Sequence, residues 1–146
     1  MNRLAAFLAA GLLLGAVRAG AQEAGEGYRR EIQIQPLLRT TTDAAGQPLV
    51  YPQADQPQIT SVMVEIPPGA QTGWHKHPYP CVAYILSGSL SVEMEGGKVH
   101  EISAGQALAE SVNVLHNGRN TGTEPVKLVM FVMGEKDKPF TVKASQ

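Results

Sequence analysis

Apolar and polar residues alternate with a period of two along most of the chain beyond residue 58, which is the pattern of half-buried β-strands. In the first run Val62, Val64 and Ile66 share one face, and Pro67-Pro68-Gly69 ends it. No stretch of the same region repeats apolar residues at helical spacing. The alternation predicts strands at 62–66, 82–86, 89–95, 99–102, 107–114 and 126–133.

Many short strands separated by turn residues are typical of an all-β sandwich or barrel with one core. We expect this barrel to occupy residues 59–134. Residues 22–58 precede it as an N-terminal arm, with short strands near Ile32–Gln35 and Leu49–Tyr51, and residues 135–146 follow it as a C-terminal tail.

The first 21 residues have the three parts of a secretory signal peptide. Arg3 gives a positive start, Leu4–Val17 is apolar and uncharged, and Ala19–Ala21 resembles a cleavage site before Gln22. The alternative is an uncleaved membrane anchor, although the apolar stretch is shorter than the roughly 20 residues that cross a bilayer. We therefore expect a periplasmic or secreted protein without a membrane span after cleavage.

Charge and cysteine content narrow the range of partners. The formal net charge is −1, and the 12 basic residues form no stripe that could neutralise phosphates, so nucleic acid is not an expected partner. The single cysteine, Cys81, cannot make an internal disulfide.

Two histidines lie in a spaced motif, Gly-x5-His-x-His-x3-Cys-x6-Gly, formed by Gly69, His75, His77, Cys81 and Gly88. Residues two apart on a strand point to the same face, so the two imidazoles can converge on one ion. The prolines that follow His77 bend the chain, and this bend can return Cys81 to the same pocket.

A second motif, Gly-x5-Ser-x-Asn-x2-His-x3-Asn, contains Gly105, Ser111, Asn113, His116 and Asn120. His116 is a third candidate ligand that arrives on another strand. Asn113 can adopt a left-handed turn conformation, and Asn120 is expected to brace the ends of strands through local hydrogen bonds.

These two segments resemble the two conserved motifs of the cupin superfamily in order and spacing over residues 69–120. The resemblance implies a double-stranded β-helix or jelly-roll barrel with His75, His77 and His116 as ligands of one divalent metal ion. It also implies a homodimer. Cys81 stands where the family motif has a glutamate ligand, so the resemblance carries over three histidines and no carboxylate.

Three roles for Cys81 remain open: a small buried core residue, a thiolate ligand, or a redox group beside the metal. The third role resembles the cysteine dioxygenase branch of cupins, in which three histidines bind iron. Glu110 also has two interpretations, an exposed strand residue or a base or substitute carboxylate ligand. Cys81 and Glu110 are therefore the candidate catalytic residues.

A three-histidine site on a barrel leaves coordination positions for substrate or dioxygen. The first hypothesis is a dioxygenase-like, metal-dependent oxidoreductase that acts on a small molecule and uses Fe, Mn or Cu. Zn and Ni are also possible. The alternatives are a metal- or ligand-binding protein without turnover, and a metal-dependent isomerase, lyase or decarboxylase. The expected pocket lining is mostly apolar: Val62, Val64, Leu90, Val92, Met94, Leu128, Met130 and Val132.

Overall fold

The computed structural model describes residues 31–145, so the predicted signal peptide lies outside the described residues. The chain divides into two units, Met1–Pro36 and Leu37–Gln146. In the first unit, residues 31–36 carry no helix or strand. Within residues 31–145, no helix has the length and apolar character that crossing a bilayer requires.

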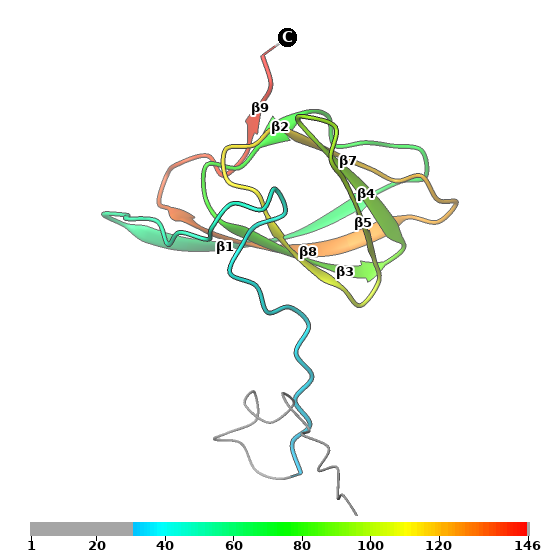
Figure 1. Cartoon of the computed structure of the whole chain (residues 1–146), viewed down its shortest axis with the longest axis horizontal. Helices are drawn as coiled ribbons and strands as arrows, with labels where there is room; N and C mark the ends of the chain where they lie inside the picture. The colour runs from blue at the N-terminus through cyan, green and yellow to red at the C-terminus, as the bar shows by residue number, and fades with distance from the viewer. Residues whose placement is uncertain (1–30, 146) are drawn as a thin grey trace, which may run out of the picture. The chain divides into compact units, whose positions relative to one another are not determined.

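The second unit is built from two antiparallel sheets (Figure 1). One sheet has the strand order β1-β8-β3-β6, and the other has the order β5-β4-β7-β2-β9. The strands are β1 (Pro57–Ile66), β2 (His75–Lys76), β3 (Cys81–Ser87), β4 (Ser89–Met94), β5 (Val99–Ser103), β6 (Ala107–Glu110), β7 (His116–Arg119), β8 (Val126–Glu135) and β9 (Val142–Lys143). The predicted all-β fold is confirmed.

Alternation along each strand places one set of side chains between the sheets. In β8, Val126, Leu128, Met130 and Val132 are buried, while the residues between them are exposed or half-buried. The facing strands contribute their own alternate residues, and together they form one core: Ile66, Cys81, Ala83, Ile85, Leu90, Val92, Ile102, Val126, Leu128, Met130 and Val132. The period-two pattern of the sequence therefore identified the correct inward face.

Two motif residues hold the turns that connect these strands. Gly88 has φ 78°, and a Cβ there would lie 3.1 Å from the Pro125 carbonyl oxygen, so the position requires glycine. Asn113 has φ 59°, which confirms the expected left-handed turn. This turn also explains why the run predicted at 107–114 is too long, since β6 ends at Glu110.

The buried side chain of Asn120 braces strand ends as expected. Its Nδ2 donates to the carbonyls of Ile66 at 2.9 Å and Glu124 at 2.8 Å, and its Oδ1 accepts from the Gly122 N–H at 3.0 Å. These three bonds tie the end of β1 to the loop that leads into β8.

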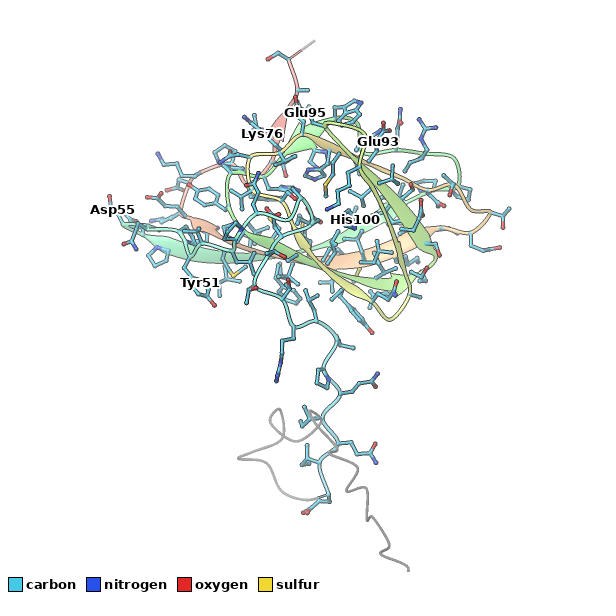
Figure 2. All side chains as sticks on the ribbon, viewed as in Figure 1. Tyr51, Asp55, Lys76, Glu93, Glu95 and His100 are labelled. Carbon is cyan, nitrogen blue, oxygen red and sulfur yellow. The ribbon has the colours of Figure 1, made fainter. Side chains whose placement is uncertain are left out.

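The arm before β1 forms no strand in its described part. The alternation at 32–35 and the apolar residues at 49–51 do not become strands; an isolated bridge, Thr42 to Pro48, is present instead. Ala44 anchors the arm: its N–H donates to the Ala109 carbonyl, and its own carbonyl accepts from Lys98 and from Nε2 of His100, labelled in Figure 2. Four residues of alternation form a strand only where another strand is free to pair with them.

The segment after β8 returns to the second sheet. β9 pairs with β2, with Lys143 opposite His75, and the Ala144 N–H donates to the Trp74 carbonyl at 3.0 Å. We call residues 138–144 the C-terminal strap. Phe140 and Thr141 in this strap line the same cavity as the three motif histidines.

Candidate metal centre

The second sheet brings the three motif histidines together. His75 in β2 and His116 in β7 are direct cross-strand partners, so their side chains lie on the same face. His77 follows β2, and the Asn113 N–H holds its carbonyl at 2.8 Å. One ring nitrogen from each histidine lies within 4.8 Å of the others.

Backbone carbonyls fix the orientation of all three rings. Nδ1 of His75 lies 2.7 Å from the Gly73 carbonyl oxygen. The matching distances are 2.8 Å from His77 to the Phe140 carbonyl and 3.0 Å from His116 to the Val114 carbonyl. A carbonyl oxygen only accepts, so each Nδ1 carries the proton, and the Nε2 lone pair of each neutral ring is free for another partner.

These lone pairs fit a metal ion. Bonds of about 2.1 Å to one ion place neighbouring ligand nitrogens roughly 3.0–3.4 Å apart, so the three nitrogens, which lie within 4.8 Å of one another, would move closer together around an ion. Moreover, Nε2 of His116 is buried and has no hydrogen-bond partner in the described chain. A metal ion would satisfy this atom, and imidazole nitrogens suit Mn, Fe, Ni, Cu and Zn.

Glu110 lies beside the histidines, so its interpretation as an exposed strand residue is wrong. Its side chain is 16% exposed, and its Oε2 lies 2.9 Å from Nε2 of His77 and 3.6 Å from Nε2 of His116. Burial would raise the pKa of Glu110, but the contacts with His116 and His77 outweigh burial and lower it to about 2.

The same contacts act on the imidazoles. Burial opposes a charge on His77, but its hydrogen bonds with Cys81 and Glu110 outweigh burial and raise its pKa to about 10. For His75, burial lowers the pKa, and the hydrogen bond with the Gly73 carbonyl and the charge of Glu110 offset burial only in part. The opposite pKa shifts of His77 and Glu110 therefore favour a positive charge between these two side chains.

Cys81 lies in the core next to this cluster. Its side chain is buried, and its Sγ donates to the Tyr79 carbonyl at 3.3 Å. Burial raises the pKa of the thiol, so it stays protonated at neutral pH. Cys81 does not line the cavity that contains the histidines; with Glu110 it lines a second cavity of about 380 Å³.

The histidines open into a cavity of about 330 Å³ inside the barrel. Of the eight residues predicted to line it, Met94 and Val132 do not, and these six do: Val62, Val64, Leu90, Val92, Leu128 and Met130. Among residues 31–145, no lysine or arginine lines it, and Thr72 and Thr141 supply hydroxyl groups.

The strap residues Phe140 and Thr141 are site residues that the sequence did not indicate. Both line the cavity, the Phe140 carbonyl orients His77, and Oγ1 of Thr141 lies 3.3 Å from the same Nδ1. Residues 135–141 lack alternation, and one of their contributions is a backbone carbonyl, which every residue type carries. The one available signal was an aromatic residue, Phe140, in an otherwise polar stretch.

Comparisons with known proteins identify a matching family model and a similar enzyme. The family model of the cupin domain matches residues 62–132. An (R)-mandelonitrile lyase from Granulicella tundricola is 27% identical over 95 residues, which cover 62% of this chain and 63% of that protein, so the match spans less than two thirds of the relative.

Two solved structures show the same fold. A conserved protein with a double-stranded β-helix domain from Klebsiella pneumoniae superposes with a TM-score of 0.53 at 21% identity, covering 66% of this chain and 91% of the other. Oxalate decarboxylase from Bacillus subtilis, a protein with Mn(II) centres, superposes with a TM-score of 0.52 at 24% identity, covering 58% of this chain and 23% of the other.

Proposed function

This chain belongs to the cupin superfamily, and from that premise we propose that it is a mononuclear metal-dependent lyase for a small, uncharged, largely apolar molecule. The observation that carries the proposal is the set of three Nε2 atoms, oriented by three carbonyls, at one end of an apolar cavity. A bound divalent ion would supply Lewis-acid polarisation of a substrate oxygen.

The cavity supports the proposed substrate class. A volume of about 330 Å³ accommodates a small molecule, and walls of Val, Leu and Met favour an apolar body. Because the described part of the chain places no lysine or arginine in the lining, a dianion such as oxalate would find no cationic side chain there among these residues. Thr72 and Thr141 can hydrogen-bond a hydroxyl or carbonyl group, and Phe140 adds an aromatic side chain to the lining.

The similarity to an (R)-mandelonitrile lyase supports the reaction class. Its substrate has an apolar body and one hydroxyl group, which matches the chemistry of this cavity. We propose Mn or Fe as the metal, with Cu, Zn and Ni as alternatives, because Mn(II) occupies the structurally similar oxalate decarboxylase.

A dioxygenase-like oxidoreductase is the second candidate. It is favoured by the number of ligands, since three histidines leave open positions on an octahedral ion where both dioxygen and a substrate could bind. Consumption of dioxygen separates it from a lyase, which needs no oxidant.

The test begins with protein purified in the presence of each metal, with metal content measured per chain. Mandelonitrile is then supplied with and without dioxygen, and release of benzaldehyde is followed by absorbance. We expect one ion per chain, oxygen-independent release, and loss of both in His116→Ala. Full metal content in His116→Ala would overturn the site, and turnover only with dioxygen would favour the second candidate.

Export also remains our proposal. It is supported by the sequence pattern of residues 1–21, and the expected mature protein begins at Gln22. N-terminal sequencing of protein recovered from a bacterial periplasm or culture medium tests it. A chain that retains Leu4–Val17 in the membrane fraction would contradict it.

A further inference from the structure

Glu110 lies directly across from Cys81. Residues of β3 and β6 pair antiparallel, with Cys81 opposite Glu110 and Ala83 opposite Leu108. Directly opposite residues project to the same face, with Cβ atoms about 4.5–5.5 Å apart. A carboxylate at residue 110 therefore reaches the same region of the barrel as a side chain at residue 81, where the cupin motif has its glutamate.

The contacts of Glu110 require a cation between it and the imidazoles. Its Oε2 lies 2.9 Å from Nε2 of His77, whose Nδ1 proton is committed to the Phe140 carbonyl. A carboxylate oxygen and a nitrogen lone pair repel each other at this distance unless a proton or a metal ion lies between them. Nε2 of His116, 3.6 Å from the same oxygen, has no hydrogen-bond partner of its own.

Charge balance also favours Glu110 as a ligand of the metal ion. Three neutral imidazoles around a divalent ion would leave two positive charges in a largely apolar cavity, and burying an unbalanced charge is costly. Of the carboxylates in residues 31–145, only Glu110 lines this cavity. Ligation by Glu110 would reduce the net charge of the centre to one.

Cys81 hydrogen-bonds with His77, but two observations make it a weaker candidate ligand than Glu110. Its Sγ is engaged with the Tyr79 carbonyl, and the residue lies outside the lining of the histidine cavity.

We propose that Glu110 is the fourth metal ligand, so that β6 supplies the carboxylate that the cupin motif places on β3. This inference rests on the metal centre of the proposed function. It makes the site a three-histidine, one-glutamate centre, although the first motif lacks the glutamate. It also predicts that a glutamate at residue 81 can replace the glutamate at residue 110 as a metal ligand.

The test measures Mn(II) affinity by competition with a chelator, together with the electron paramagnetic resonance spectrum of the bound ion. The variants are Glu110→Ala, Glu110→Gln and the swap Cys81→Glu/Glu110→Ala. Glu93→Gln is the matched control, because Glu93, labelled in Figure 2, is an exposed strand glutamate. Circular dichroism of the metal-free proteins checks that each variant folds.

Loss of a residue that only supports a ligand costs about 10–100-fold in metal affinity. We expect Glu110→Ala to weaken Mn(II) binding by more than ~100-fold and to alter the spectrum of the bound ion. Glu93→Gln should match the wild type, and the swap variant should recover most of the lost affinity. A Glu110→Ala affinity within ~100-fold of wild type with an unchanged spectrum would overturn the proposal. A folded swap variant that binds no more tightly than Glu110→Ala would overturn the cross-strand argument.

These outcomes separate the two proposals. If the wild-type protein binds no Mn(II), Fe(II), Cu(II), Zn(II) or Ni(II), the metal centre itself is wrong, and this inference falls with it. If the wild type binds and Glu110→Ala binds equally well, the three-histidine centre stands and only the role of Glu110 is wrong.

Discussion

Metal binding should displace one proton, because the metal-free site holds a proton that the metal must replace. The contacts with Cys81 and Glu110 overcome burial and raise the pKa of His77 to about 10. At pH 8, two units lower, about 99% of His77 is protonated. A metal ion needs the bare Nε2 lone pair. Apparent metal affinity should therefore rise about tenfold per pH unit from pH 7 to pH 9 and level off above the pKa of His77.

Isothermal titration calorimetry in buffers of different ionisation enthalpy measures the protons released. At pH 8 we expect about one proton per metal ion. Binding heats that do not depend on the buffer would refute the reasoning, because they would mean that His77 is already neutral. Nuclear magnetic resonance of the metal-free protein gives the pKa of His77 directly, and Glu110→Gln should lower it by removing the charge that stabilises the imidazolium.

Three further predictions concern packing, the cavity and assembly. Asn120→Ala removes three hydrogen bonds, so urea denaturation should show a loss of about 3 kcal/mol at about 1 kcal/mol each; a loss below about 1 kcal/mol would contradict the bracing role. Phe140→Ala keeps the carbonyl that orients His77 but opens the cavity, so metal affinity should stay within about threefold while bulkier cyanohydrins bind better; a large loss of metal would instead assign the ring a role in holding the site. Met63 and Phe131 are 65% and 45% exposed on the outer face of the first sheet, so sedimentation should show a homodimer that Met63→Glu/Phe131→Glu converts to a monomer, and a monomeric wild type would rule this interface out.

The pairing that brings His116 opposite His75 is long-range, and it was expected only from the resemblance to the cupin motifs. Two local features of the site could be predicted from neighbouring residues. A spacing of two places His75 and His77 on one face, and the asparagine at 113 permits the left-handed turn that precedes His116. Such features follow from neighbouring residues alone.

Glu110 could not be assigned in the same way, because its role depends on register. Leu108 and Glu110 share a face of β6, but only the pairing of β6 with β3 shows that this face is the interior. The alternation in the sequence is equally compatible with an exposed Glu110 and with a Glu110 in the site. Only the pairing of the strands in the folded protein decides between the two interpretations.

The strap was predicted only as a tail, since its contribution is least visible in sequence. Its two-residue strand is too short to give an alternation signal, and its contact with His77 uses a main-chain oxygen. Side-chain patterns carry no information about such a group.

The carbonyl of Phe140 has a consequence for the order in which the site is assembled. A ribosome has made all three histidines once residue 116 is complete, yet the group that presents Nε2 of His77 comes 24 residues later, at residue 140. A nascent or prematurely terminated chain thus contains every imidazole but lacks the hydrogen bond that aims one of them. Binding of the proposed metal ion at a fully oriented site would therefore have to follow synthesis of the strap.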